Sequence, residues 1–406
     1  MTGIVVALAF LCAAVLSALL PTGARLGIWL PLHLAMAGAA STAVAAVMPF
    51  FSAAIATTQP VASWLRWSAV IAVAVGGAGV SLGFAQGQPT TAALAGLLFL
   101  VGLTLTAMAT LAPVSKALGP RGGVITLGYA AALAFVAVGA ALATAMLLGV
   151  ESVAASWVWL KPAHAWLNMV GFVSLVIATT LLHFFPTVIG ARIKRTPSAY
   201  LTVAGLGLGA ALVAVGFGAR SDTLARLGAA LSLAGVGGLF TYAWQVWQTR
   251  ARWTGDRGWH TFAMGGLISA MGWFGLSMVL AAGRVLLDGI APAGTSNEAL
   301  VTPFVAGWMG LAVLASATHL VPSIGPGGPH AHGRQRVLLG RGGRARLLAA
   351  DAGIGALALG HPMAVEPLTV AGLALLLAAL GSTTALIGLA VISGLSDARR
   401  SGTLRA

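Results

Sequence analysis

Histidine is the residue type in this chain whose placement could support metal chemistry. Five histidines in long apolar runs are candidate cofactor ligands: His33, His164, His183, His260 and His319. Neutral imidazole binds haem iron and copper, and two histidines on different helices at one depth can hold a haem b between them. We therefore predict that at least one pair of these residues binds haem b or copper. The alternative is that each is an interfacial histidine, hydrogen-bonded to lipid headgroups or to backbone carbonyls.

Methionines beside two histidines extend this prediction to copper. Met36 follows His33 by one helical turn, and Met363 follows His361 by two residues. Because thioether sulfur is a soft ligand that suits Cu(I), we predict a metal-binding role for His361 and Met36. The alternative is that these methionines fill gaps in a hydrophobic core.

Two further polar residues lie inside apolar runs. Asn168 follows His164 by one turn, so it could hydrogen-bond the imidazole and fix its tautomer, or it could link two helices. Asp351 is the one acidic residue well inside a predicted span, where it could relay protons or pair with Arg346. We expect either the ion pair or an interfacial position for Asp351, because the apolar run around it is short.

His330 and His332 lie in a Gly- and Pro-rich segment that precedes five arginines. This segment could bind a transition metal weakly, but we expect a solvated loop that faces lipid headgroups.

Motifs of soluble enzymes and of nucleotide-driven pumps are absent from the sequence. It has no phosphate-binding loop and no HExxH motif. Its single cysteine, Cys12, excludes an intramolecular disulfide and a cysteine-based metal cluster.

The elements that must position these residues are membrane-spanning helices. The chain is 59% hydrophobic and 7% charged, whereas a soluble domain carries roughly 25% charged residues. At about 1.5 Å per residue, a crossing needs roughly 17 to 25 apolar residues. We predict an all-α, polytopic transmembrane bundle that forms a single domain over residues 1–406. Its twelve expected spans are 3–20, 29–56, 67–85, 91–112, 124–148, 162–190, 200–218, 224–247, 259–282, 301–320, 347–361 and 368–392.

Charge distribution gives these spans an orientation. Of the 22 Lys and Arg residues, 17 lie in the loops after even-numbered spans or in the C-terminal tail. The positive-inside rule therefore predicts a multi-pass protein of the cell inner (plasma) membrane with both termini in the cytoplasm. His33, His164 and His361 then lie toward the external face, and the other three span histidines toward the cytoplasmic face. The net charge of +14 fits membrane lipid as a partner, and we expect no nucleic-acid binding.

Related strings open three of the spans, at residues 33–38, 166–171 and 260–265. Each places His or Trp five residues before Gly. They record either the duplication of a helical unit or a chance similarity in a Gly- and Ala-rich chain.

Several motifs together are similar to a known superfamily. They are Pro-Leu-His at 31–33, the segment 164–171, His-Phe-Phe-Pro at 183–186, and the segment 297–325. With twelve spans, they resemble the haem–copper oxidase catalytic subunit, and in particular its divergent relatives. Those relatives are the NnrS family, linked to nitric-oxide metabolism, and membrane modules found beside or fused to copper nitrite reductases. The resemblance implies bound haem b or copper and a copper-enzyme or electron-transfer partner.

The sequence also departs from that superfamily. No tyrosine follows His164 or His183 at a turn's spacing, the seventh span has no histidine, and the tenth has only His319. We therefore expect electron transfer or nitrogen-oxide metabolism, as part of an oxidoreductase system, without oxidase activity. The alternatives are a transporter of copper or another small solute, and a non-catalytic scaffold subunit of a membrane complex.

Overall fold

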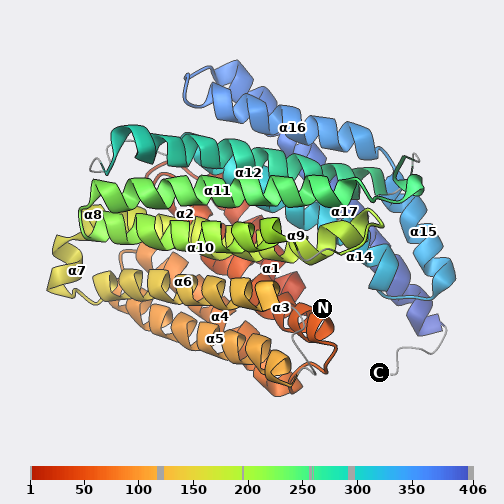
Figure 1. Ribbon diagram of the computed structural model, residues 1–406, viewed down its shortest axis with the longest axis horizontal. Helices are drawn as coiled ribbons and strands as arrows, with labels where there is room; N and C mark the ends of the chain where they lie inside the picture. Colours follow the sequence, from red (N-terminus) through yellow and green to blue (C-terminus); the bar gives the residue numbers. More distant parts are fainter. Residues whose placement is uncertain are drawn as a thin grey trace. The chain divides into compact units, whose positions relative to one another are not determined.

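The fold is all-α, as predicted. The computed structural model describes residues 2–116, 123–193, 196–255, 258, 260–290 and 298–400, and none of these residues lies in a β-strand. Parts of the charge and motif predictions lie outside the described residues, namely Arg121, Lys194, Arg195, Arg257, Arg405 and the beginning of the segment 297–325. Figure 1 shows long helices connected by short turns.

Ten helices of the described residues are long and apolar enough to cross a membrane, which makes the chain a multi-pass membrane protein. They are Trp29–Ala56 (α2 Trp29–His33, η1 Leu34–Ala40 and α3 Ser41–Ala56), α4 Ser63–Ala85, α5 Pro89–Ser115, α6 Gly123–Leu147, Trp157–Val188 (α8 Trp157–Trp166, η2 Leu167–Ser174 and α9 Leu175–Val188), α10 Pro197–Gly218, α11 Asp222–Trp247, α12 His260–Asp288, Leu300–Ile324 (within α13 Glu298–Thr302, η4 Pro303–Gly310 and α14 Leu311–Ile324) and α17 Glu366–Arg400.

The other two expected spans are also helical. The N-terminal helix α1 (Thr2–Ala18) is apolar but short. Helix α16 (Gly343–Gly360) contains two arginines and Asp351, which lower its hydropathy. Two short helices connect longer ones, α7 (Glu151–Ala155) and α15 (Pro329–Gly340). Ten spans thus satisfy both length and composition, and the count of twelve stays a prediction.

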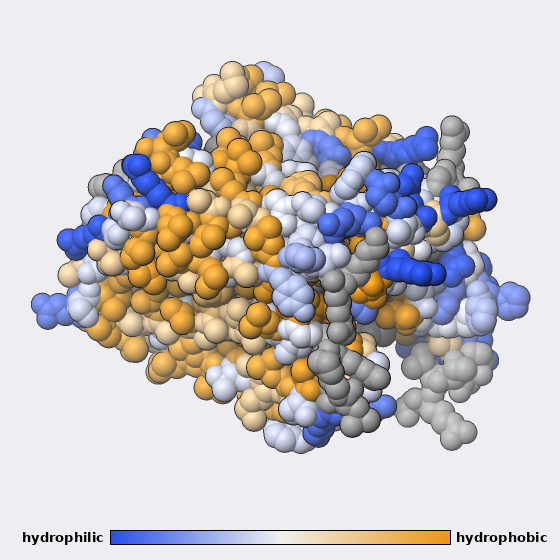
Figure 2. Space-filling model, viewed as in Figure 1, coloured by the Kyte–Doolittle hydropathy of each residue, from blue (hydrophilic) through white to orange (hydrophobic). Residues whose placement is uncertain are grey.

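Helix packing follows the distribution of small and large side chains. Alanine and glycine face neighbouring helices, while large aliphatic residues such as Leu94 and Leu208 are exposed along the spans. A Cβ on Gly205 would lie 2.6 Å from Gly235 Cα, so glycine is what lets α10 and α11 approach this closely. Figure 2 shows hydrophobic residues over the middle of the helices and hydrophilic ones gathered toward their ends, as a lipid environment requires.

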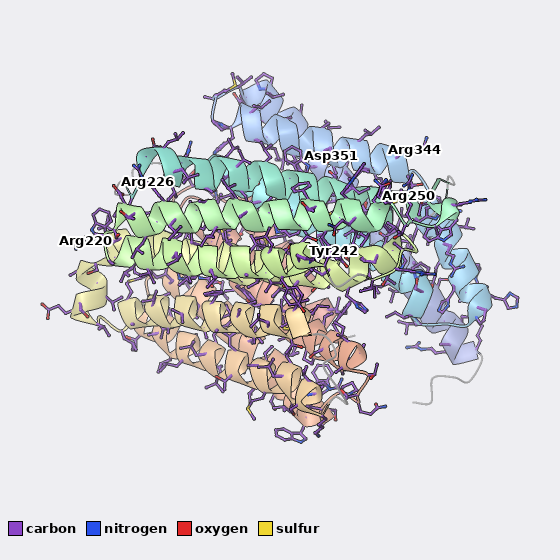
Figure 3. All side chains as sticks on the ribbon, in the orientation of Figure 1. Arg220, Arg226, Tyr242, Arg250, Arg344 and Asp351 are labelled. Atoms are coloured by element: carbon purple, nitrogen blue, oxygen red, sulfur yellow. The ribbon has the colours of Figure 1, made fainter. Side chains whose placement is uncertain are left out.

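The contacts of the chain cluster into two compact units. The first comprises Met1–Thr179, Val203–Gly235 and Asp288–Gly294. The second comprises Thr180–Thr202, Val236–Leu287 and Thr295–Ala406. In the second unit, the hydroxyl of Tyr242 on α11 donates a hydrogen bond to the backbone carbonyl of Leu182 on α9 (Figure 3).

Three of the spans contain π-helical stretches, which are rare and are frequent at functional sites. They are η1 (Leu34–Ala40), η2 (Leu167–Ser174) and η4 (Pro303–Gly310). The first two coincide with the related strings at 33–38 and 166–171, whereas the third string lies in the ordinary α-helix α12. A wider helix therefore begins directly after His33 and three residues after His164.

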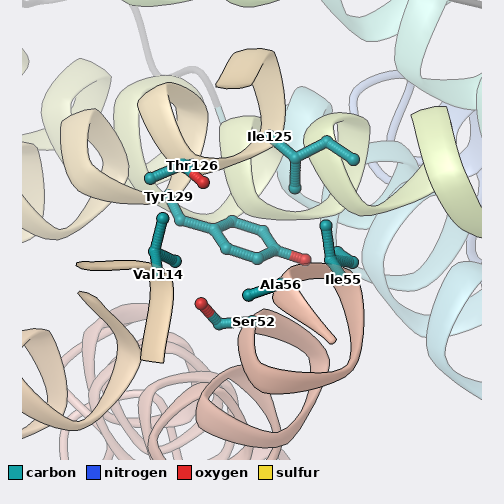
Figure 4. A pocket seen from close by; sticks show the side chains of 7 residues that line it. All are labelled: Ser52, Ile55, Ala56, Val114, Ile125, Thr126 and Tyr129. Atoms are coloured by element: carbon teal, nitrogen blue, oxygen red, sulfur yellow. The ribbon is translucent and has the colours of Figure 1, made fainter. Parts of the chain in front are cut away.

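A small hollow lies between α3 (Ser41–Ala56), α5 and α6. Figure 4 shows the Tyr129 ring extending from α6 toward Ser52 and Ala56 on α3. No histidine lines this hollow, so it contains none of the predicted ligands.

Candidate haem or metal site

His33 and His164 are brought together in the first unit. His33 is the last residue of α2 (Trp29–His33), and His164 lies in α8 (Trp157–Trp166). Their ring centroids are 6.5 Å apart, and the ring planes are within 11° of parallel. The sequence predicted only that these two histidines share a depth; the structure makes them neighbours.

The separation suits two imidazoles that share one metal ion. Two metal–nitrogen bonds of about 2.0–2.1 Å, together with about 1.1 Å from each nitrogen to its ring centre, span about 6.3 Å. The observed 6.5 Å between centroids is close to that value. The distance between the ring centroids is therefore compatible with two imidazoles that would hold one metal ion.

Backbone carbonyls hold both rings through the same nitrogen. His33 Nδ1 lies 2.8 Å from the carbonyl oxygen of Trp29, and His164 Nδ1 lies 2.9 Å from that of Gly139 on α6. A carbonyl oxygen only accepts, so each Nδ1 carries the proton and donates it. In a neutral imidazole, Nε2 then carries the lone pair that a metal needs. Both rings are thus held in the tautomer of a metal ligand.

Asn168 lies beside His164, as its spacing predicted. Its side-chain nitrogen is 2.7 Å from the His164 carbonyl oxygen and 3.3 Å from His164 Nδ1. A nitrogen that donates to Gly139 cannot also accept from Asn168, and the shorter contact with Gly139 favours the first arrangement. The described contacts therefore indicate that the Gly139 carbonyl fixes the tautomer of His164. A role for Asn168 in fixing that tautomer stays a prediction.

Gly139 also provides the space in which these contacts are made. A Cβ at this position would lie 2.4 Å from the side-chain nitrogen of Asn168. Nothing in the sequence pattern singled out this glycine, because its contribution is a carbonyl group on another helix.

Aromatic rings surround the pair. Trp29 stacks on His33 with 3.9 Å between centroids, and Phe84 lies 4.4 Å from Trp29. Trp157 lies 6.1 Å from His164. Both histidines are half-buried, and the neighbouring aromatic rings limit the access of water to the site.

The remaining predicted ligands of the external group are placed differently. His361 is exposed and follows the last residue of α16, in the second unit. Met36 is half-buried within η1, three residues after His33. Within the described residues, no group of three or more His, Cys, Asp or Glu side chains could hold a metal ion. The candidate site is thus a pair of imidazoles.

The histidines that the sequence predicts toward the cytoplasmic face lie in the second unit. His260 begins α12, is 6% exposed and meets the Trp253 ring edge-on at 4.9 Å. His319 on α14 (Leu311–Ile324) makes an edge contact with Phe184 at 5.6 Å. His183 precedes Phe184 on α9 (Leu175–Val188) and is half-buried. Aromatic side chains thus contact both His260 and His319.

Asp351 does not pair with Arg346, so the ion pair is wrong, and the interfacial position stays a prediction. Its carboxylate accepts hydrogen bonds from Ser269 Oγ and, at 2.8 Å, from Trp273 Nε1, both on α12 (Figure 3). Five residues along an α-helix turn the side chain by about 140°, which places Arg346 on a different face.

Arg346 is instead held by oxygen atoms. It donates to the carbonyl oxygens of Leu339 and Arg341 and to Thr383 Oγ1. Burial lowers the pKa of its guanidinium, while the three acceptors stabilise the charged form.

The fold and the imidazole pair define a class, a multi-pass helical membrane protein with a candidate bis-histidine site. Comparison with models of known protein families and with curated proteins finds no match for the chain. The resemblance to haem–copper oxidase relatives therefore stays a prediction from the sequence motifs.

Proposed function

We propose that the protein is an integral membrane redox protein that binds haem b or copper between His33 and His164. It acts in electron transfer or nitrogen-oxide metabolism beside a copper enzyme or another electron-transfer partner. One observation carries the proposal: two nearly parallel imidazoles, 6.5 Å apart, each donate from Nδ1 to a backbone carbonyl.

The donors of the pair fit both groups. Two imidazole nitrogens are the axial set of a six-coordinate haem b, and they are also a sufficient set for Cu(I), with the thioether of Met36 nearby in the chain. Either group would supply one-electron chemistry when bound. The residues of the chain would orient the imidazoles through Trp29 and Gly139 and limit water through the tryptophan rings.

The proposed location is the cell inner membrane, with both termini in the cytoplasm. Its support is the concentration of basic residues in alternate loops of the sequence. In this orientation the imidazole pair lies toward the external face, where a partner outside the cytoplasm could exchange electrons with it.

Spectroscopy of the detergent-purified protein tests the proposal. We expect either a Soret band with low-spin haem signals or copper by elemental analysis, and the loss of either in His33→Ala and His164→Ala. His330→Ala is the matched control, because His330 is exposed on α15 and should retain the cofactor. A wild-type protein with neither a Soret band nor copper would overturn the proposal, as would full retention in both histidine variants.

A further inference from the structure

The segment that contains His330 and His332 forms a helix, α15, and the expected loop is wrong. One face of this helix is buried through Ala331, Gln335 and Leu339, which recur every fourth residue. The side-chain nitrogen of Gln335 donates to the carbonyl oxygens of Pro326, at 3.1 Å, and of Ala390 on α17, at 3.0 Å. The helix is therefore anchored to α17 and has a fixed outward face.

The outward face carries an open hollow of about 540 Å³. Its lining residues recur at helical spacing and include His330, Gly333, Arg334, Val337, Leu338 and Arg341. Figure 1 shows α15 as a short helix between the longer helices α14 and α16, all within the second unit. Helix α15 thus follows a candidate membrane span, which ends at Ile324, and precedes α16, which the sequence predicts to be a span.

The hollow combines cationic and apolar side chains. Arg334 and Arg341 are exposed and lie seven residues apart, so they project from the same side of the helix two turns apart. Val337, which lies between them, is 68% exposed, and Leu338 lies next to it. Two cations flanking an apolar strip match a molecule with a negative group and a hydrocarbon chain.

The charges that face the hollow leave it positive. Arg334 forms an ion pair with Asp397 at 2.9 Å, and Asp397 also accepts a hydrogen bond from the backbone of Gly328. This pair holds Arg334 in place but offsets its charge. Arg341 supplies a second cation, and the exposed Arg336 and Arg344 lie close in the chain. An anion is therefore attracted chiefly toward the Arg341 end.

We propose that this hollow binds an anionic phospholipid, with its phosphate at Arg341 and Arg334 and an acyl chain along Val337 and Leu338. Basic pockets beside membrane helices are suited to such headgroups because the leaflet supplies them at high local concentration. The proposal is independent of the cofactor, since all of its residues lie in the second unit and none belongs to the imidazole pair.

The test measures lipid binding by the full-length protein. Purified protein in neutral detergent is mixed with phosphatidylglycerol or with phosphatidylcholine, and retained lipid is counted by native mass spectrometry. We expect preferential retention of phosphatidylglycerol, reduced about tenfold by Arg341→Gln. Arg250→Gln is the matched control, because Arg250 is exposed, lies over Trp247 and is outside the hollow.

Two further variants separate folding from binding. Arg334→Lys keeps the charge that pairs with Asp397 and should retain lipid, whereas Val337→Asp should reduce retention without disturbing the buried face of α15. Equal retention of both lipids, or equal losses in Arg341→Gln and Arg250→Gln, would overturn the proposal. Complete displacement of the lipid by inorganic phosphate would also overturn it, because the acyl chain would then contribute nothing.

Discussion

His33 and His164 differ in what holds each ring, and that difference decides which substitutions disturb the pair. His33 is tied to Trp29, one turn earlier on its own helix, whereas His164 is tied to Gly139 on a neighbouring helix. The hydrogen bond from His33 to Trp29 is local and forms when the helix itself forms. The second depends on the packing of α6 against α8, so it is the more sensitive of the two.

Gly139→Ala tests this dependence. The new methyl group would lie 2.4 Å from the side-chain nitrogen of Asn168, and overpacking of this kind typically costs about 1–3 kcal/mol. We expect a lower melting temperature and, in protein that remains folded, a several-fold lower cofactor content. Gly237→Ala is the control, because a Cβ there has no neighbour within 4 Å. Unchanged cofactor content in Gly139→Ala would argue against the carbonyl as an orienting group.

The carboxylate of Asp351 gives a second prediction at this scale. Trp273→Phe removes one of its two described donors, and hydrogen bonds to charged groups contribute about 1.5–3 kcal/mol. We expect a clear decrease in thermal stability in detergent, measured by the loss of helical circular dichroism. Trp244→Phe should have little effect, since Trp244 is 65% exposed. Equal stability of the two variants would mean that the Trp273 bond contributes nothing.

At the residue scale, the sequence predicts the types of the ligands but not their partners. The apolar context and the charge pattern assign His33 and His164 to one depth. The sequence does not predict that Gly139 orients His164. Every residue has a backbone carbonyl, and only helix packing determines which carbonyl lies beside the ring. The pairing of Asp351 with α12 is missed for a similar reason, since its donors lie far away in the sequence.

At the scale of elements, the π-helical stretches set the direction in which side chains leave each span. A π-helix has more residues per turn than an α-helix, so every residue after it is rotated relative to an unbroken α-helix. In the first unit, η1 follows His33 directly and is continued by α3. This rotation about the helix axis therefore sets the direction of the His33 side chain relative to the face of α3 that packs against neighbouring helices.

Deleting Ala40, the last residue of η1, should bring this span closer to a regular α-helix. We expect helical content by circular dichroism to change little, while the cofactor is lost because His33 rotates relative to α3. Deleting Gly23 is the control, since it lies in the turn before α2 and a Cβ at this position would have no neighbour within 4 Å. Full cofactor retention after deletion of Ala40 would show that η1 does not position the ligand.

The helical elements themselves are largely predictable from the sequence, because apolar run length is set by membrane thickness. All twelve expected runs are helical over most of their described length, and four of them end one or two residues beyond the helix. The π-helical character of η4 is not predictable, since Pro303–Gly310 reads as an ordinary apolar stretch. Helix α15 is missed because its few apolar residues are masked by glycine, proline and arginine.

At the scale of the whole molecule, alternation of charge is the feature that assigns a direction to every span. On α11, Arg226 is near the beginning and Arg250 lies just past the end, and Figure 3 labels both. The proposed orientation places the first at the external face and the second in the cytoplasm.

Cysteine labelling tests this orientation. In a Cys12→Ser background, Gln88→Cys in the turn before α5 should react with a membrane-impermeant maleimide in intact cells. Gln248→Cys, after α11, should react only once the membrane is opened. Both positions are exposed and lie in turns outside the helices, so the two cysteines differ chiefly in the side of the membrane that the orientation assigns to them. Labelling of Gln248→Cys in intact cells would reverse the orientation and move the imidazole pair to the cytoplasmic side.

The π-helical stretches also bear on how homologues of this chain are recognised. A protein in which η1 or η2 has relaxed to an α-helix would need fewer residues to cover the same length of span. Aligning it correctly would require a gap within a membrane helix, where alignment scoring usually penalises gaps most. For the span that contains η2, His164 and the His-Phe-Phe-Pro motif at 183–186 could not both be matched to their counterparts without that gap.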